Sequence, residues 1–268
     1  MKNFVLIGNG VMGKRHCERL LAVGSSCVAT ADTAEEANEV FESLRTGAVL
    51  ADFSVIAAPA TLHFEYAKKC LELGLHTFVE KPIALNFEDA NALIALAKKK
   101  QLILFPGHSE RYSETFESFA KTTKPLLKNG DVHLTFIRHN LPSDRCRDVP
   151  CTLDILVHDL DMFFALCGVD FEAEVLAATC DFDQARLTLR LSNVTADFDV
   201  CRNAKEPCRS ILFESECAKF IADFCNAKQV QDTLSREQNI FLNSDSKKLA
   251  AEQSSAALAV KIASSLNV

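Results

Sequence analysis

Near its start the chain reads Asn3-Phe4-Val5-Leu6-Ile7-Gly8-Asn9-Gly10-Val11-Met12-Gly13, an apolar run that passes directly into a glycine-rich turn. The apolar run suits a short buried strand and is too short for a helix, whereas a helical pattern begins near Met12. The three glycines are therefore expected in a strand-to-helix turn. In such a turn they permit a tight bend, let the backbone approach a pyrophosphate and allow the helix to pack closely on the strand. In this context the pattern predicts a dinucleotide-binding fold.

A second strand is predicted at residues 27–31, and it ends at Asp32, 19 residues beyond Gly13. A carboxylate at this place accepts hydrogen bonds from the adenosine ribose and repels a 2′-phosphate. No Arg or Lys lies between Asp32 and Arg45 to receive such a phosphate. The expected cofactor is therefore NAD, with NADP the less favoured alternative. The residues expected to contact it here are Gly8, Asn9, Gly10, Val11, Met12, Gly13 and Asp32.

The composition is typical of a protein that is folded nearly throughout. Of its 268 residues 48% are hydrophobic and 24% charged, and nine Gly and seven Pro leave no room for long disordered tracts. Residues 1–124 carry 14 basic against 15 acidic side chains, and residues 125–268 carry 15 against 21. Neither half has the basic excess of a nucleic-acid-binding domain. The eleven cysteines form no CxxC pair, so we expect reduced thiols and no zinc site.

No targeting or membrane segment is predicted. Gly8 ends the first hydrophobic run after four residues, which is too short for a signal peptide. Nothing in the chain approaches the roughly 18 consecutive apolar residues of a membrane span. These observations favour a soluble, cytoplasmic protein without membrane partners.

The first part of the chain continues to alternate strand and helix patterns. Further strands are predicted at residues 53–58, 76–79 and 102–105, and helices at residues 33–44, 62–73 and 86–100. Repeated alternation of this kind predicts a doubly wound parallel sheet with right-handed crossovers. We therefore expect an α/β Rossmann domain at residues 1–122.

Beyond Pro125 the pattern changes to β-type runs separated by turn residues. The runs lie at residues 132–139, 174–180, 185–191, 195–201 and 210–214, and helices are predicted at residues 154–166 and 246–266. These segments predict an α+β domain at residues 123–268 with a mostly antiparallel open sheet. Its length suits a second domain with its own core.

Two turns follow strands of the first domain and are expected at the carboxyl edge of its sheet, where open α/β folds bind ligands. One begins at Ala58 and Pro59 and reaches His63, and the other is Glu80-Lys81-Pro82. These two turns, the Gly8–Gly13 turn and residues 154–159 form four short motifs. The four motifs occur in the order found in a known family. The chain thereby resembles the Gfo/Idh/MocA oxidoreductases.

The resemblance implies a nicotinamide cofactor on the first domain, beside Ala58, Pro59, His63, Glu80 and Lys81. It also implies a substrate on the sheet of the second domain, and homodimers or homotetramers formed through that sheet. The β runs agree with self-association, because several are apolar at alternate positions and an uncovered face would pair with a copy of itself. The predicted second domain therefore binds substrate and assembles the oligomer.

Within the family, the words at residues 107–112 and 153–161 are most similar to the branch that oxidises UDP-N-acetylated sugars at C3. The chain differs from this branch at Arg111-Tyr112-Ser113-Glu114, where Arg-Phe-Asn-Pro is usual. The resemblance assigns catalysis to Lys81, Asp154 and His158.

Oxidising a secondary alcohol requires loss of a hydride to nicotinamide while a base removes the hydroxyl proton. Asp154 and His158 are four residues apart, so on a helix they share a face and the carboxylate can orient the imidazole. We expect His158 to be the general base and Lys81 to polarise the oxygen. A metal site formed by His158 with Asp159 and Asp161 is the alternative. No other cluster converges on it, so no metal is expected.

A nucleotide-linked sugar would need cationic ligands for its phosphates, and arginine binds phosphate in a bidentate manner. The candidate residues for substrate binding are Arg111, Arg138, Arg145 and Arg147. A solvated charged loop is the alternative explanation for the last three. Two other functions stay open, a dehydrogenase of a free polyol or small sugar and a non-catalytic NAD-binding sensor or partner protein. The first would need no such arginines, and the second would need none of the three catalytic residues.

Overall fold

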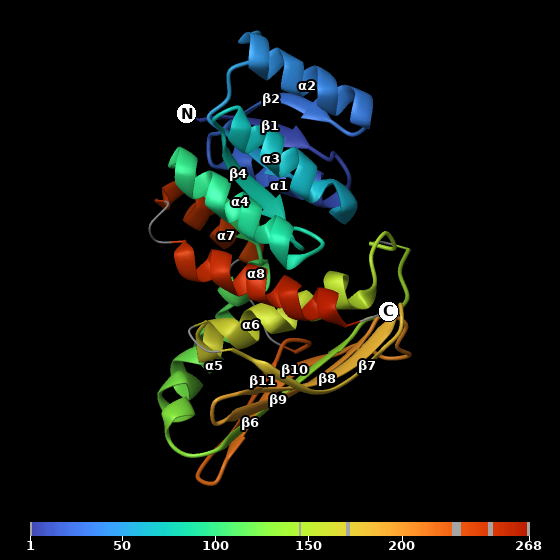
Figure 1. Ribbon diagram of the computed structural model, residues 1–268, viewed down its shortest axis with the longest axis vertical. Coiled ribbons are helices and arrows are strands. Elements are labelled where there is room, and N and C mark those ends of the chain that lie inside the picture. The colour runs from blue at the N-terminus through green and yellow to red at the C-terminus, as the bar shows by residue number, and fades with distance from the viewer. Residues whose placement is uncertain (1, 145, 170–171, 227–231, 246–248, 267–268) are drawn as a thin grey trace. The chain divides into compact units, whose positions relative to one another are not determined.

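A computed structural model describes residues 2–144, 146–169, 172–226, 232–245 and 249–266 (Figure 1). The chain divides into two compact units. The first contains Met1–Gly107 and Leu234–Gln253, and the second contains His108–Thr233 and Ser254–Val268. Packing thus divides the chain at Gly107, whereas the sequence placed a boundary between residues 122 and 123. The segment Leu234–Gln253, near the end of the chain, also packs with the first unit.

The first unit is built on a five-stranded parallel sheet of order β2-β1-β3-β4-β5. Its strands are β1 (Asn3–Ile7), β2 (Ser26–Ala31), β3 (Phe53–Ile56), β4 (His76–Glu80) and β5 (Leu104–Gly107). Its helices include α1 (Val11–Ala22), α2 (Ala34–Thr46), α3 (His63–Glu72) and α4 (Phe87–Lys100). The predicted doubly wound Rossmann fold is confirmed.

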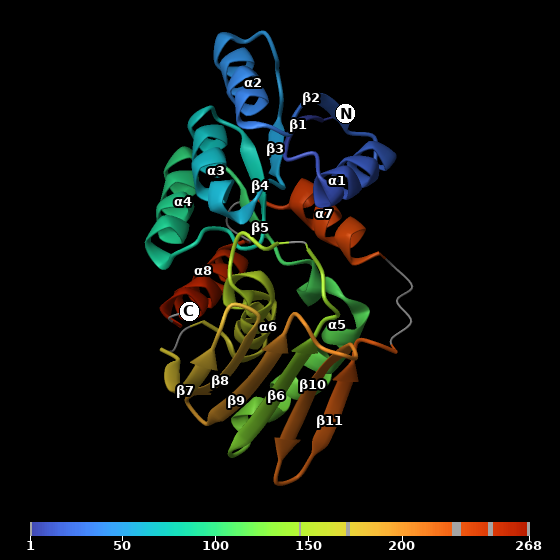
Figure 2. The same ribbon diagram turned by 90° about the vertical axis from the view of Figure 1, so that its right-hand side faces the viewer.

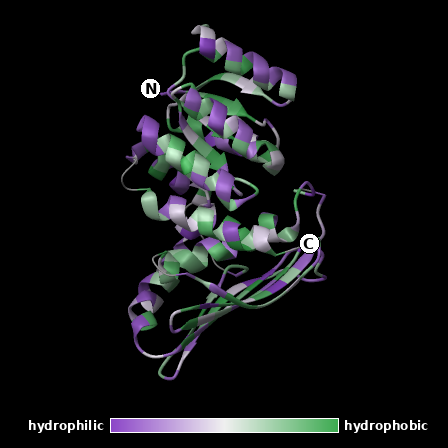
Figure 3. Ribbon diagram, viewed as in Figure 1, coloured by the Kyte–Doolittle hydropathy of each residue, from purple (hydrophilic) through white to green (hydrophobic). Residues whose placement is uncertain are grey.

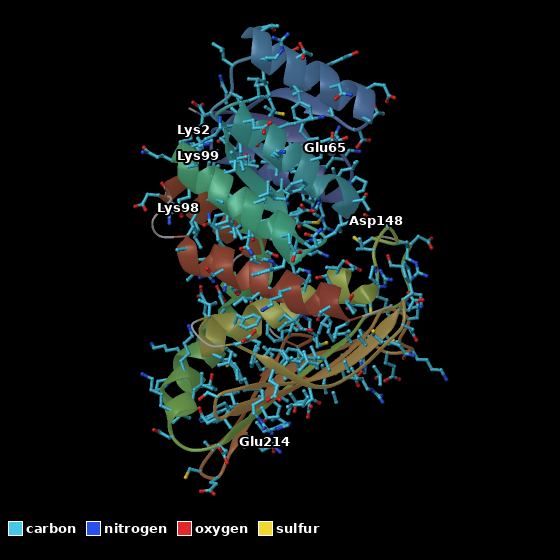
Figure 4. The ribbon with its side chains drawn as sticks, viewed as in Figure 1. Lys2, Glu65, Lys98, Lys99, Asp148 and Glu214 are labelled. Carbon is cyan, nitrogen blue, oxygen red and sulfur yellow. The ribbon has the colours of Figure 1, made fainter. Side chains whose placement is uncertain are left out.

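The helices of this unit begin and end where local sequence signals indicate. Thr33 and Glu36 form a reciprocal capping box at the start of α2. Asn86 caps α4, whose last turn is basic, and Figure 4 labels Lys98 and Lys99 of that turn. In Figure 3 the outward-facing α2 is mostly hydrophilic and the strands beside it are mostly hydrophobic.

Helix α7 (Thr233–Asn243) was not predicted from the sequence. Its Phe241 ring packs edge-on against the rings of Phe53, Phe78 and Phe105 from three strands of the first sheet. Figure 2 shows α1 and α7 on one side of that sheet, with α3 and α4 on the other. Helix α7 therefore completes one face of the Rossmann core from a position late in the chain.

The second unit contains a six-stranded sheet of order β11-β10-β6-β9-β8-β7, in which only the β6 and β9 pair is parallel. Its strands are β6 (Val132–His139), β7 (Glu174–Cys180), β8 (Gln184–Leu191), β9 (Val194–Cys201), β10 (Cys208–Ser215) and β11 (Lys219–Asp223). Its helices are α5 (Glu114–Thr123), α6 (Val157–Cys167) and most of α8 (Ala250–Ser265). The mostly antiparallel sheet is confirmed. The helix predicted at residues 246–266 corresponds to α8, and its first predicted residues, 246–248, lie outside the described residues.

One face of this second sheet packs against α6. Phe136 and Phe198 stack on each other and both meet the ring of Phe163 from α6. On the opposite face, histidines of β6 meet carboxylates of β9, with His133 Nε2 lying 3.0 Å from an oxygen of Asp197. The apolar alternate positions of the central strands are thus covered within the chain. They do not supply the uncovered apolar face from which self-association was argued.

Candidate active site

The glycine turn after β1 has the geometry that a dinucleotide requires. Gly8 has φ +96°, and a Cβ there would lie 2.4 Å from the backbone of Ala57. A Cβ on Gly13 would lie 1.8 Å from the Gly8 oxygen, so the first and third glycines are fixed by packing. A Cβ on Gly10 would meet no atom within 4 Å. The open backbone at Gly10, at the start of α1 and without a side-chain cap there, fits the approach of a pyrophosphate.

Asp32 lies directly after β2, beside this turn. Its Oδ1 accepts a hydrogen bond from the Asn9 backbone N–H at 2.9 Å. Glu36 accepts hydrogen bonds from the backbone N–H groups of Asp32 and Thr33, and these hydrogen bonds lower the pKa of its carboxyl group. Asp32 after β2 and Glu36 in the first turn of α2 therefore place two carboxylates close to the glycine turn, which suits a ribose with a free 2′-hydroxyl.

His63 joins the two turns predicted at the carboxyl edge of the first sheet. Its Nε2 lies 2.8 Å from the Ala58 oxygen, and its Nδ1 lies 2.7 Å from the Pro82 oxygen. The ring is buried, and burial lowers its pKa. His63 was predicted to contact the cofactor. In the structure both ring nitrogens lie within hydrogen-bond distance of backbone carbonyls, so the side chain links Ala58 of one turn to Pro82 of the other.

Lys81 follows β4 as predicted and is half-buried. The backbone N–H of Lys81 donates to Oε2 of Glu80 at 3.2 Å. The Glu80 side chain is therefore used to hold the turn that carries the lysine.

Asp154 and His158 lie across a junction between two kinds of helix. Asp154 is in a π-helical turn, Thr152–Leu156, and His158 is in the first turn of α6. The prediction assumed an uninterrupted α-helix, for which residues four apart share a face. A π-helical turn inside a helix occurs frequently at functional sites. That Asp154 orients His158 remains a prediction, because the α-helical spacing on which it was based does not hold through this turn.

A second histidine lies edge-on to the first. The ring centroids of His108 and His158 are 6.0 Å apart with an interplanar angle of 88°. His108 is buried, and its Nδ1 lies 3.9 Å from Oδ2 of Asp161. The two histidines lie 50 positions apart in the chain, and no local pattern predicted that they meet.

The candidate phosphate-binding arginines are engaged by carboxylates where the structure describes them. Arg138 is buried, donates to both oxygens of Asp159 and pairs with Glu110. Arg111 Nε lies 3.3 Å from Asp161, and Arg147 pairs closely with Asp183. Arg145 lies outside the described residues.

Arg138 is therefore better explained as a structural cation of the second unit than as a substrate ligand. Its guanidinium is shared by two carboxylates and is hidden from solvent. The Arg147 side chain keeps 41% of its surface exposed and is the described candidate most available to a phosphate.

Arg202 is a residue that sequence reasoning missed. It lies just after β9 and is buried. Its Nη1 donates to the carbonyls of Cys146 and Val149 at 2.8 and 3.0 Å and lies 3.5 Å from Oδ2 of Asp154. One guanidinium thus joins the loop before the π-helical turn to the predicted catalytic carboxylate.

Among the described residues, no group of three His, Cys, Asp or Glu side chains is placed to hold a metal ion. No helix among the described residues is both long enough and apolar enough to cross a membrane.

Residues 2–108 match the model of an oxidoreductase family with an NAD-binding Rossmann fold, Gfo/Idh/MocA. The match to this family covers the first unit up to the start of the second, and the chain is similar to the family over that part. The match covers β1 to β5, which hold the glycine turn, Asp32 and Lys81. The match identifies residues 2–108 as an NAD-binding oxidoreductase domain.

Two curated relatives illustrate the similarity in sequence. UDP-N-acetylglucosamine 3-dehydrogenase of Acidithiobacillus ferrooxidans is 28% identical over 236 residues, covering 82% of this chain and 74% of the relative. Myo-inositol 2-dehydrogenase of Thermotoga maritima is 27% identical over 198 residues, covering 64% of this chain and 56% of the relative.

Solved structures share the fold over residues of both units. The structure of UDP-N-acetylglucosamine 3-dehydrogenase GnnA from A. ferrooxidans aligns with a TM-score of 0.77 at 25% identity, covering 98% of this chain and 97% of that one. The WlbA dehydrogenase of Bordetella pertussis, solved in complex with NADH and UDP-GlcNAcA, aligns with a TM-score of 0.77 at 18% identity, covering 98% and 96%. The second likeness concerns the fold alone.

Proposed function

We propose that this chain is an NAD-dependent dehydrogenase that oxidises a secondary hydroxyl of a nucleotide-linked sugar, at C3 of a UDP-N-acetylhexosamine. The observation that carries the proposal is the similarity to the A. ferrooxidans UDP-N-acetylglucosamine 3-dehydrogenase. That similarity covers 98% of this chain in the structural comparison and so includes the second unit, where we expect the substrate. The words at residues 107–112 and 153–161 support the same branch.

In this proposal the first unit holds the cofactor. The open backbone at Gly10 and the first N–H groups of α1 receive the pyrophosphate, and Asp32 accepts from the adenosine ribose. The Ala58–Pro59 turn lies at the same carboxyl edge of the sheet. When bound, nicotinamide accepts the hydride that leaves the alcohol carbon.

Two side chains handle the alcohol oxygen and its proton. His158 takes the hydroxyl proton through Nε2, because its Nδ1 is buried. The Lys81 ammonium donates a hydrogen bond to the same oxygen and stabilises the negative charge that develops there. His108, edge-on to His158, limits the orientations open to the base.

We expect the enzyme to prefer NADH to NADPH by roughly tenfold or more, which corresponds to about 1.4 kcal/mol of binding free energy. Asp32 and Glu36 would both repel a 2′-phosphate. Fluorescence titration with each reduced cofactor measures the preference. Asp32→Ser should narrow it, whereas Glu88→Ser, at a surface carboxylate of α4, should leave it unchanged. Equal or tighter binding of NADPH by the unaltered protein contradicts the assignment.

Binding energy from the nucleotide should be needed for turnover. A UDP sugar is held at groups remote from the reacting carbon, and that energy orients the hydroxyl. We expect kcat/KM for the UDP sugar to exceed that for free N-acetylglucosamine or myo-inositol by roughly 10- to 150-fold per charge-assisted contact. Steady-state NADH formation at one NAD concentration compares these substrates.

The arginines proposed to bind the phosphates of the UDP sugar can be tested with variants and a matched control. Arg147→Ala, and Arg145→Ala outside the described residues, should raise KM for the UDP sugar alone. Arg45→Ala removes an exposed arginine of α2 that pairs with Glu42, and it should leave KM unchanged. The nucleotide-sugar proposal fails if the free polyol is oxidised as well as the UDP sugar and if neither variant changes KM for the UDP sugar. A dehydrogenase of a free polyol would then be the better assignment.

The alternative is a dehydrogenase of a free polyol or small sugar. It is favoured by the similarity to myo-inositol dehydrogenases and by the carboxylate partners of Arg111, Arg138 and Arg147. A non-catalytic NAD-binding protein is the third possibility, and NADH formation with either substrate class excludes it.

We also propose that the chain assembles as a homodimer or homotetramer through the sheet of its second unit. Family resemblance supports this assembly, and the uncovered face of β6, β8 and β9 is available for it. Its polar character, with the His133 and Asp197 pair, would make such an interface hydrogen-bonded. Light scattering at micromolar concentration tests it, since a species of only 29.5 kDa contradicts it.

A further inference from the structure

A buried chain of hydrogen bonds runs from α7 to the turn that carries Lys81, entirely within the first unit. The Gln238 amide Nε2 lies 2.8 Å from Nδ1 of His16 and 3.2 Å from the His16 backbone oxygen. On the other side of the ring, His16 Nε2 lies 2.8 Å from Oε1 of Glu80. The second carboxylate oxygen, Oε2, accepts from the backbone N–H of Lys81. Successive hydrogen bonds thus connect Gln238 to His16, His16 to Glu80, and Glu80 to the backbone of Lys81.

The donors and acceptors of this chain have one consistent arrangement. An amide NH₂ can only donate, so Nδ1 of His16 must accept from Gln238. The ring proton of the neutral imidazole then lies on Nε2 and is donated to Glu80. His16 is fully buried and Gln238 nearly so, and the Phe78 ring packs edge-on to the imidazole. The arrangement is therefore fixed by packing as well as by hydrogen bonds.

Three charged or titratable groups face the Glu80 carboxylate, namely His16 from α1, the adjoining Lys81, and His63 at the start of α3. Burial by itself would raise the pKa of Glu80. The hydrogen bond from His16 and the positive charge of the adjoining Lys81 oppose burial, and the pKa of Glu80 lies below its ordinary value. Glu80 is therefore an oriented anion, and the ionised form is the one that the hydrogen bonds stabilise.

We propose that His16 and Gln238 are positioning residues for Lys81, which hold the Glu80 carboxylate in the one orientation that fixes the lysine's backbone. The inference rests on the proposed role of Lys81 in the reaction. It gives α7 a part in that role, since α7 supplies Gln238, the residue that fixes the His16 ring from 222 positions further along the chain.

Removing either residue should lower kcat by about tenfold, the effect of losing one oriented hydrogen bond in a positioning network. His16→Leu and Gln238→Leu are the two variants, and the second keeps the test open if the first fails to fold. The Kd for NADH should stay within about threefold, since neither side chain belongs to the glycine turn or to Asp32.

The pH profile separates positioning from a merely structural role. A carboxylate with a lowered pKa is protonated only as pH falls through that value. In His16→Leu the burial of Glu80 is no longer opposed by the imidazole, so Glu80 takes up its proton at a higher pH. The acid limb of the kcat profile should therefore move to higher pH. His16→Gln, whose amide nitrogen can replace Nε2–H as donor to Glu80, should return it towards its original place.

A matched control comes from the same unit. Gln253 is also buried, and its amide donates to the Leu104 carbonyl at 2.8 Å. Gln253→Leu removes a buried amide of the same kind and should lower the melting temperature without moving the acid limb. A shift of the limb in this control equal to that in Gln238→Leu would overturn the inference.

Carbon-13 NMR of the Glu80 carboxyl group supplies a readout that needs no turnover. The carboxyl pKa should be higher in His16→Leu and Gln238→Leu than in the unaltered protein, and nitrogen-15 NMR should find the His16 proton on Nε2. A Glu80 pKa unchanged in both variants overturns the inference. If the unaltered protein oxidises neither UDP sugars nor free polyols, the proposed function fails, and the NMR result still decides the hydrogen-bond chain.

Discussion

Lys81→Met is expected to lower turnover by about 100-fold or more while leaving the Kd for NADH within a few-fold. Methionine keeps most of the side-chain volume and removes the ammonium that would stabilise the developing alkoxide. Because Lys81 is half-buried at the end of β4, its removal should disturb few packing contacts. Single-turnover reduction of bound NAD with the UDP sugar measures the chemical step directly.

His158→Ala should lower turnover by a similar factor for a different reason. It removes the general base that takes the hydroxyl proton, whereas Lys81→Met removes the ammonium that stabilises the oxygen. In this variant added imidazole should restore part of the rate. Lys99→Met is the matched control for Lys81, as it removes an exposed lysine from the last turn of α4, labelled in Figure 4. Near-normal turnover of either active-site variant on the true substrate would show that its assigned role is wrong.

The sequence predicted the first unit well because the signals there are local. Gly8, Gly10 and Gly13 lie within six residues of each other, and each helix cap is formed by residues a few positions apart. Strand and helix periodicity then fixes a parallel sheet with few alternatives. Asp32 beside Asn9, and Lys81 directly after β4, follow from the same local order.

Contacts between distant residues were beyond such reasoning. The Gln238 and His16 pair spans 222 positions, and nothing in either local pattern identifies a partner. The π-helical turn at Thr152–Leu156 inserts one residue into an apolar run that is also compatible with an α-helix. The arginine prediction counted positive charges along the chain, whereas the fold supplies each described candidate with a carboxylate from elsewhere, as Asp159 does for Arg138.

Arg202 gives the second large expected effect, on both stability and turnover. Arg202→Met should lower the free energy of unfolding by about 3–5 kcal/mol, the usual loss when one partner of a buried ionic network is removed. The change withdraws the guanidinium from the carbonyls of Cys146, Val149 and Phe182 and from Asp154. The melting temperature should fall by roughly 6–20 °C.

The same variant should reduce kcat by about tenfold or more at temperatures where it is fully folded, because the loop and the carboxylate that precede His158 lose their common anchor. Arg202→Lys should recover little of either loss, since one ammonium cannot reach three carbonyls and a carboxylate with the geometry of a guanidinium fork. Arg45→Met is the control, because that arginine is 64% exposed beside Glu42 and an exposed pair contributes little. Calorimetry and steady-state rates on the three variants give both quantities. A melting temperature of Arg202→Met within about 2 °C of the unaltered protein would show that the guanidinium does not anchor this loop. An unchanged kcat in addition would show that other residues hold Asp154.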